Sequence, residues 1–408
     1  MALRSIDVRD EIKNFQCRWE VVANKASAFL KDSNSETEFE LPYPLTIVDD
    51  VEDYKSCKVY LFKNRFFSRE DHYFNIASNN NRLGVIFPLK IYYESSQLPA
   101  YDLSKTTAFL YRFLHIAFYN LIMDDNLPSK TVDIGSLRFD DVKITDFYDD
   151  ETVVLLYHDG SSSFPDDLVK YYPSLFKYGY VPIHDEKEFK KIEMIQLSYH
   201  DQPLYDNNIF DTLQLRECNS SIIKERFIDQ IFSSTLKFSL TPLSRFILLY
   251  QVIELLIDRI AYQSYQSNFL PISTLAIKLD TVNKATSYRD IYSRLQELRN
   301  KLDSSVDKVK SEEKRIALLL NDICNLNAIS YPNFVSLSQS VIGPNRACSA
   351  LHEYVYQLRN RIVHDYHNLS LESFDIDDEM TRLNIEFEKI ISDVIISYKE
   401  NVNTFRRF

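Results

Sequence analysis

Glycine is distributed very unevenly along this chain of 408 residues, and its distribution is the strongest constraint on the fold. Four of the five glycines fall before residue 220, and only Gly343 lies after it. A stretch of about 190 residues with one glycine and no tight-turn dipeptide is typical of helices joined by short loops. The second half of the chain is therefore predicted to be helical.

The first half has a different texture, in which short apolar runs alternate with polar, turn-like clusters. The runs are rich in β-branched and aromatic residues, a composition that favours strands. Examples are residues 57–64, 83–93, 131–139 and 151–160. One segment, 106–123, instead spaces its apolar residues as an amphipathic helix does. The first half is therefore predicted to be an α+β domain.

We place the boundary of this domain in the polar stretch 199–211 and expect two domains, 1–220 and 221–408. The second is expected to be an all-α helical bundle of four or five helices. Its expected helices cover 241–265, 287–303, 311–327, 348–366 and 375–400. Thr241 is the candidate N-cap of the first of these helices. The segment 311–327 starts with a serine followed by Glu312 and Glu313, which suits the helix dipole. The last helix carries an apolar stripe of Met380, Leu383, Phe387, Ile391, Val394 and Tyr398.

The net charge of −12 lies entirely in the first half. Residues 1–220 hold 24 Lys and Arg against 36 Asp and Glu, whereas residues 221–408 hold 23 of each. A surface that tracks long nucleic acid non-specifically is basic, because phosphate contacts dominate its affinity. The composition argues against such a surface and still allows a small pocket that acts on one phosphodiester.

Two further features indicate a cytoplasmic protein. No apolar run reaches the roughly 18–20 residues that a membrane span needs, and the N-terminus lacks the apolar core of a signal peptide.

The five cysteines, Cys17, Cys57, Cys218, Cys324 and Cys348, are odd in number and include no CxxC pair. We expect buried free thiols rather than disulfides or a thiolate metal site.

The stretch "LRNRIVHDY" (358–366) combines polar and apolar residues at helical spacing. The apolar residues Leu351, Val355, Leu358 and Ile362 recur every three or four positions, so this stripe is expected to face the core. Asn360 and His364 are four residues apart and share another face, and the long side chain of Arg359 can reach the same point. The pattern Arg-Asn-x3-His arises by chance in roughly a few per cent of chains of this length.

These three side chains suit the chemistry of a phosphodiester. Arginine binds phosphate and stabilises negative charge that develops in a transition state. Histidine can transfer a proton near neutral pH, and asparagine can orient the imidazole. No carboxylate cluster with metal-ligand spacing lies nearby, so attack by a 2′-hydroxyl without a metal or cofactor fits best. One motif supplies one histidine, and a twofold dimer would supply the second proton-transfer group.

The motif resembles the signature of the HEPN superfamily, a group of helical nucleotide-binding domains. Arg359, Asn360 and His364 match that signature, and Tyr366 extends the match to the form found in HEPN toxins. The resemblance covers roughly residues 240–400. It implies a metal-independent endoribonuclease that acts on RNA as a homodimer through the C-terminal bundle, with toxin, abortive-infection or antiviral-defence roles.

The same resemblance implies supporting residues and a regulatory partner. Glu254 corresponds to a polar residue that many HEPN domains carry on an early helix facing the motif. In some family members an antitoxin transfers AMP to a tyrosine, which would be Tyr366 here. The long N-terminal half departs from the small toxins, and it suggests built-in sensing instead.

Other assignments remain open. His352, two turns before Arg359, either contacts substrate or packs within the bundle. His367 could pair with His364 at a metal, although no cysteine or acidic ligand accompanies them. The alternative function is a non-catalytic HEPN-like protein that dimerises or binds nucleotide, with its function in the N-terminal domain.

Overall fold

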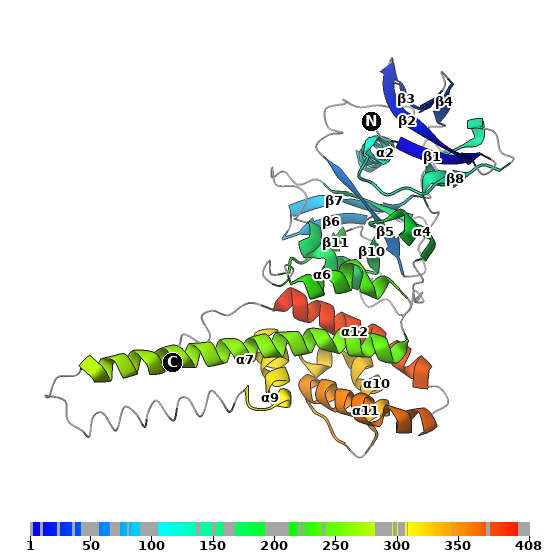
Figure 1. The fold of residues 1–408 in the computed structure, drawn as a ribbon. Coiled ribbons are helices and arrows are strands. Elements are labelled where there is room, and N and C mark those ends of the chain that lie inside the picture. The colour runs from blue at the N-terminus through cyan, green and yellow to red at the C-terminus, as the bar shows by residue number, and fades with distance from the viewer. Residues whose placement is uncertain are drawn as a thin grey trace. The chain divides into compact units, whose positions relative to one another are not determined.

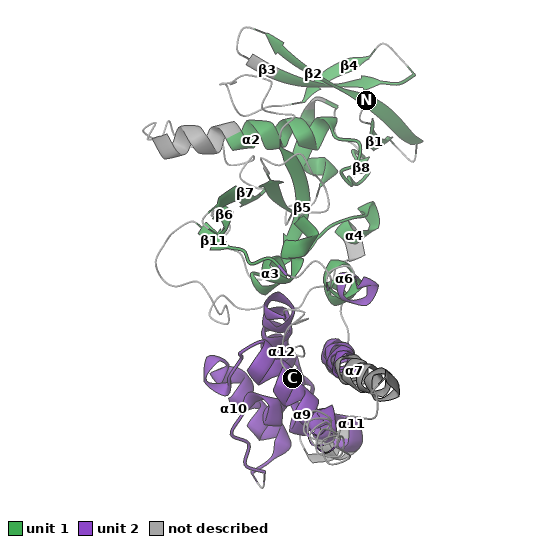
Figure 2. Cartoon of the chain, turned by 90° about the vertical axis from the view of Figure 1, so that its left-hand side faces the viewer, with its two compact units in different colours: residues 1–217, 230–239 green, residues 218–229, 240–408 purple. Residues whose placement is uncertain are grey.

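The structure is a computed structural model, whose elements are labelled in Figure 1. Two compact units are distinguished (Figure 2). The first comprises Met1–Glu217 and Gln230–Ser239, and the second comprises Cys218–Asp229 and Leu240–Phe408. The residues described are 3–8, 11–22, 25–34, 37–41, 57–65, 74–79, 81–89, 105–135, 139–148, 152–157, 168–191, 212–218, 222, 225–238, 241–281, 296, 300, 307, 309–344, 346–372 and 376–398.

The first unit begins with an antiparallel meander of four strands. They are β1 (Leu3–Val8), β2 (Glu11–Val22), β3 (Lys25–Asp32) and β4 (Glu38–Leu41). The two-residue strand β8 (Val132–Asp133) adds to β1 in parallel, which gives the order β4-β3-β2-β1-β8. Alternate residues of β2, such as Phe15 and Cys17, are buried, so one face of the sheet belongs to the core.

The second sheet of this unit has six strands in the order β10-β5-β9-β7-β6-β11. Its central strands β5 (Lys58–Asn64), β7 (Asn81–Pro88) and β9 (Thr152–Tyr157) pair antiparallel. The outer strands are β6 (Phe74–Ser78), β10 (Tyr180–Pro182) and β11 (Thr212–Gln214). The predicted strands at 57–64, 83–93 and 151–160 correspond to β5, β7 and β9, whereas the described residues of 131–139 contribute the short β8 and the first residue of a 3-10 helix, Phe139.

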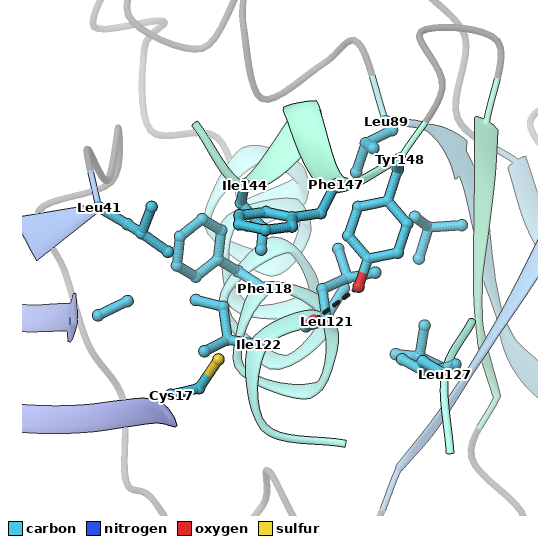
Figure 3. Packing of buried hydrophobic residues seen from close by; sticks show 14 of the residues in the cluster. Cys17, Leu41, Leu89, Phe118, Leu121, Ile122, Leu127, Ile144, Phe147 and Tyr148 are labelled. Atoms are coloured by element: carbon cyan, nitrogen blue, oxygen red, sulfur yellow. Dashed lines mark hydrogen bonds between the residues drawn. The ribbon is translucent and has the colours of Figure 1, made fainter. Parts of the chain in front are cut away.

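Helix α2 (Lys105–Met123) is the helix that the periodicity of 106–123 predicted, and it packs against strands of both sheets (Figure 2). Its residues Phe118, Leu121 and Ile122 are fully buried in one apolar cluster (Figure 3). That cluster also holds Cys17 and Leu41 from the first sheet and residues of β5, β7 and β9 from the second. The helix is therefore the middle layer of a sheet–helix–sheet core.

The C-terminal end of α2 is capped by two buried side chains. Arg4 on β1 donates from Nη2 to the carbonyl oxygen of Leu121 at 2.6 Å and to that of Asp124 at 3.3 Å. The hydroxyl of Tyr148 donates to the same Leu121 oxygen at 2.6 Å. Carbonyl groups in the last turn of a helix have no intrahelical partner, and a cation there also suits the helix dipole. Arg4 and Tyr148 thus satisfy polar groups that the core would otherwise leave unpaired.

Short helices complete the described part of this unit. The α-helices are α3 (Tyr172–Lys177), α4 (Glu186–Lys191) and α6 (Arg226–Ser233), and the 3-10 helices are η2 (Phe139–Asp141), η3 (Ile144–Phe147), η4 (Leu168–Tyr171) and η6 (Thr235–Lys237). Helix α6 spans the boundary between the two units at 229/230. Lys237 on η6 has a fully buried side chain that binds Glu188 on α4 at 2.7 Å. This pair ties the 230–239 segment to the rest of the first unit.

The second unit is helical, as the scarcity of glycine predicted. Its described helices are α7 (Pro242–Thr281), α9 (Glu312–Ala317), the π-helix η7 (Leu318–Ile323), the 3-10 helix η8 (Ala328–Ser330), α10 (Pro332–Ile342), α11 (Leu351–Glu372) and α12 (Ile376–Ser397). Helix α7 packs against α9 and α12, and α11 packs against α9 and α10. A strand-rich N-terminal part followed by a helical C-terminal part is therefore confirmed.

Packing in this unit follows the predicted apolar stripes. Every residue of the α12 stripe is buried, from Met380 through Tyr398, and so are the four α11 residues Leu351, Val355, Leu358 and Ile362. Phe246 of α7, Phe387 of α12 and Phe334 of α10 form a stack with ring centroids 5.3 and 5.7 Å apart. The predicted N-cap at Thr241 is present, because its hydroxyl accepts a hydrogen bond from the backbone N–H of Ser244. The Ser311 hydroxyl accepts from the backbone N–H of Lys314 and caps α9.

The structure departs from the sequence expectations at several places. Helix α7 continues past Pro271 to Thr281, 16 residues beyond its predicted end at 265. Helix α9 turns into a π-helix, in which Cys324 N bonds the Leu319 oxygen five residues earlier. Helix α10 and the grouping of residues 230–239 with the first unit were not expected. The boundary stretch 199–211 lies outside the described residues, as does 287–303 except for Gln296 and Asn300.

Two further observations concern the expectations for membranes and thiols. None of the helices in the described residues is both long and apolar enough to cross a bilayer.

All five cysteines are free, and four of them are buried, whereas Cys348 is partly exposed. Burial raises the pKa of the Cys17 thiol to about 11 and that of the Cys324 thiol to about 12. These buried thiols behave as small apolar groups of the core.

Candidate functional site

Helix α11 carries the site, and its start is set by local hydrogen bonds. The Glu353 carboxylate accepts from the backbone N–H of Ser349 at 2.6 Å and from that of Ala350 at 3.3 Å. These bonds hold the pKa of Glu353 below its usual value. They also satisfy N–H groups that the first helical turn leaves unpaired. The phase of the helix is thereby fixed, and its apolar stripe turns Arg359, Asn360 and His364 away from the core.

The three motif side chains meet on one face of α11. Nη1 of Arg359 donates to the Oδ1 oxygen of Asn360 at 3.2 Å and lies 3.3 Å from Nε2 of His364. His364 is exposed, while Arg359 and Asn360 are partly buried. The trio expected from residue spacing is therefore assembled, with the imidazole open to solvent and the guanidinium behind it.

The contact between Arg359 and His364 defines the imidazole's hydrogen-bonding role. A guanidinium can only donate hydrogen bonds, so Nε2 must present its lone pair for this contact to form. For this hydrogen bond to form, the proton of the imidazole must therefore be on Nδ1. In that tautomer Nε2 can accept a proton from a hydroxyl group when the hydroxyl replaces Nη1 of Arg359 as its partner.

Two residues beneath Arg359 extend the site onto neighbouring helices. Oε1 of Glu312, in the first turn of α9, lies 3.6 Å from Nε of Arg359. This distance allows an ion pair, although it is too long for a hydrogen bond. The ring of Tyr250 on α7 lies 5.9 Å from the Arg359 guanidinium carbon. Its hydroxyl donates to the same Glu312 oxygen at 2.5 Å. The guanidinium is therefore held by a carboxylate on one side and an aromatic ring on another.

Glu254 belongs to the same group. It lies one helical turn after Tyr250 on α7, so the two residues share a helix face. Burial raises the pKa of Glu254, the positive charge of Arg359 opposes that shift, and the nearby carboxylate of Glu312 adds to it. The pKa of Tyr250 is raised as well, first by burial and then by its hydrogen bond to Glu312. Arg359 is thus the cation that balances two carboxylates.

His352 makes a different contact from the motif residues. Its Nδ1 atom lies 3.0 Å from Nδ2 of Asn321 in the π-helix, so the amide donates to the ring. Seven residues separate it from Arg359, which corresponds to about 10 Å along the helix axis. The described contacts of His352 link α11 to the π-helix, and they favour the packing assignment over a role with the trio.

Two expectations fall partly outside the described residues. The backbone of Tyr366 and His367 continues α11, but their side chains are not described, and the pairing of His367 with His364 falls there too. Within the described part of the chain, no group of three or more His, Cys, Asp and Glu side chains is arranged to hold a metal ion.

Sequence reasoning missed Glu312 and Tyr250. Glu312 was interpreted only as an acidic residue at the start of a helix, where it suits the dipole. Tyr250 stands in the apolar run 246–258, and no pattern in the sequence assigned it a role. Its spacing of four from Glu254 was a signal that both residues share a face. No sequence signal indicated that α9 would bring Glu312 close to Arg359, because the two residues are 47 positions apart along the chain.

Comparison with protein-family models, curated proteins and solved structures finds no match to this chain. The family resemblance therefore rests on the sequence motif alone.

Proposed function

We propose that this protein is a metal-independent endoribonuclease of the HEPN type. The observation that supports the proposal most directly is the arrangement around Arg359, whose Nη1 lies 3.3 Å from Nε2 of His364 and 3.2 Å from Oδ1 of Asn360. A cation and a proton acceptor at this separation can contact a phosphate and its neighbouring hydroxyl together.

In the proposed reaction, Nε2 of His364 removes the proton from a ribose 2′-hydroxyl. The 2′-oxygen then forms a bond to phosphorus, and the bond from phosphorus to the 5′-oxygen breaks. Arg359 stabilises the charge that builds on the phosphoryl oxygens, because its guanidinium donates charge-assisted hydrogen bonds. Asn360 orients the guanidinium through Oδ1. The products are a 2′,3′-cyclic phosphate and a 5′-hydroxyl end.

The leaving 5′-oxygen needs a proton from a second group. We propose that a second copy of the chain supplies it, with the two α11 faces meeting in a homodimer. The exposure of His364 supports this role, since the imidazole is open to a partner on the solvent side. In this proposal the first unit is a sensing or regulatory part, and the protein acts in the cytoplasm as a toxin or antiviral effector. A regulatory or antitoxin protein is its further partner. These cellular roles rest on the family resemblance.

The test is cleavage of mixed cellular RNA and of a defined oligoribonucleotide in excess EDTA. The wild-type protein is compared with His364→Ala and Arg359→Ala. Arg361→Ala is the matched control, because Arg361 lies on the same helix with 24% of its side chain exposed, against 22% for Arg359. We expect wild type and the control to cleave, leaving 2′,3′-cyclic phosphate ends, and both site variants to be inactive.

An oligonucleotide with a single 2′-deoxy sugar provides a second control, since that position should resist cleavage. Cleavage by His364→Ala or Arg359→Ala would contradict the proposed site. If neither the wild type nor any variant cleaves RNA, and both site variants bind RNA as the wild type does, the result would favour a non-catalytic protein that only dimerises or binds nucleotide.

A further inference from the structure

We infer that Glu312 and Tyr250 form a positioning pair that sets the orientation of the Arg359 guanidinium. The inference rests on the proposed function and assigns these residues to its machinery. Neither residue is part of the nine-residue motif, and they come from two other helices, α9 and α7.

The first step of the argument concerns the two ends of the guanidinium. Nε of Arg359 faces Glu312, while Nη1 faces Asn360 and His364. An arginine side chain has many rotamers, and holding one geometry costs conformational entropy. Contacts at both ends of the planar fork restrict its rotation, so the guanidinium meets a phosphate already oriented.

The second step concerns how Glu312 itself is held. Its Oε1 oxygen accepts the Tyr250 hydroxyl at 2.5 Å, and Glu312 stands in the first turn of a helix whose N-cap is Ser311. Its side chain is 25% exposed. The ring of Tyr250, which carries this hydroxyl, lies 5.9 Å from the guanidinium carbon of Arg359. The three groups thus constrain one another.

Contact with Arg359 distinguishes Glu312 from its neighbour Glu313, although both carry the same charge. Both stand in the first turn of α9, and both are partly buried. Only Glu312 is within ion-pair distance of Arg359. If a dipole contribution at the helix start were its whole role, the two residues would behave alike on substitution. Glu313→Gln is therefore the matched control for Glu312→Gln, because each change removes one negative charge from the same turn.

The first readout does not depend on RNA. Phenylglyoxal labels arginine side chains, and an ion pair slows the reaction of the paired guanidinium. Chymotryptic cleavage after Tyr356 and Tyr366 leaves Arg359 and Arg361 in one peptide, so Arg361 serves as the internal reference. We expect Glu312→Gln to raise the ratio of Arg359 to Arg361 labelling by about fivefold. Tyr250→Phe should raise it less, and Glu313→Gln should leave it unchanged.

The second readout is RNA cleavage. We expect Glu312→Gln to lower kcat/KM by about 10- to 100-fold, because a misplaced catalytic group loses rate steeply. The same substitution in an Arg359→Lys background should add almost nothing, since Glu312 acts through the guanidinium. Thermal unfolding must be the same for Glu312→Gln and Glu313→Gln, which separates positioning from loss of structure.

The outcomes distinguish the two proposals. An unchanged labelling ratio in Glu312→Gln would overturn the positioning role. So would a loss of kcat/KM from Glu312→Gln that adds fully to the loss from Arg359→Lys. In either case, RNA cleavage by the wild-type protein would leave the proposed function intact. If the wild-type protein cleaves no RNA, the proposed function fails, and the labelling ratio alone then decides whether Glu312 orients Arg359.

Discussion

Arg245 on α7 donates a hydrogen bond from Nε to Oε1 of Glu388 on α12 at 2.5 Å, and the two side chains are 5% and 1% exposed. This ion pair lies deep in the helical unit, near the aromatic stack of Phe246 and Phe387. It joins the helix that carries Tyr250 and Glu254 to its neighbour in the bundle. The placement of two site residues therefore depends on a buried pair of charges.

We expect Glu388→Gln to lower the free energy of unfolding of the helical unit by about 3–5 kcal/mol, because it leaves a buried guanidinium without its counter-charge. The double variant Arg245→Met/Glu388→Leu should recover most of that loss. Urea unfolding followed by circular dichroism at 222 nm measures both. A double variant as unstable as Glu388→Gln would contradict this account.

Arg359→Lys should reduce RNA cleavage by about 100-fold or more, although it keeps the positive charge. Lysine lacks the planar fork that reaches Asn360, His364 and Glu312 at once. Initial rates on a fluorogenic oligoribonucleotide measure the loss. Arg361→Lys is the control and should retain wild-type rates, because Arg361 pairs with Asp365 at 3.0 Å on another part of α11. Equal activity of both variants would mean that only charge matters at position 359.

The stability of the first unit should fall at alkaline pH because of Tyr148. Burial raises the pKa of Tyr148 to about 12 from the ordinary value of 10.0. A raised pKa means that the contribution is fully present below about pH 10 and is lost as the pH rises through about 12. Between about pH 8 and about pH 11, this group should remove about 1.4 kcal/mol of stability.

Tyr148→Phe isolates that effect. At about pH 8 the variant should be about 1 kcal/mol less stable, since the hydrogen bond to the Leu121 oxygen is lost. At about pH 11 the difference should vanish or reverse, because phenylalanine does not ionise. The fluorescence of Trp19, the only tryptophan, reports this unit during urea unfolding, since its ring lies 5.9 Å from that of Phe118 on α2. Phe118→Leu should show a cost that does not change with pH.

Gly84→Ala should destabilise the six-stranded sheet. A Cβ at this position would collide with the backbone carbonyl oxygen of Leu156 on the neighbouring strand β9, and backbone atoms cannot rotate away. We expect a loss of about 2–3 kcal/mol or more in urea unfolding followed by Trp19 fluorescence. Asn81→Ala, at the exposed start of the same strand, should cost much less. A cost for Gly84→Ala as small as that of Asn81→Ala would show that the strands can separate at this point.

Much of the architecture was predictable because it depends on local patterns. Helical periodicity identified α2, α11 and α12, and their buried stripes followed the expected residues. Thr241 marked a helix start, because a hydroxyl at that position can bond the backbone of the first turn. The motif trio was also predictable, since Asn360 and His364 are four residues apart on the helix and the long side chain of Arg359 can reach them.

Other features depend on contacts between distant segments, and local patterns do not encode them. Helix α7 continues through Pro271, although a proline removes a helical hydrogen bond and usually ends a helix. The π-helix at Leu318–Ile323 adds a residue to one turn and changes which faces of that segment meet α11. Neither feature follows from the propensities of the residues involved.

The sequence by itself determined the helical half, the strand-rich half and the trio of Arg359, Asn360 and His364, because each rests on spacing within one segment. Only the tertiary structure decided that Glu312 of α9 and Tyr250 of α7 surround that arginine. The physical reason is that helix packing brings together residues whose separation along the chain carries no periodic signal. The motif supplies the reactive groups, and the bundle determines how they are held.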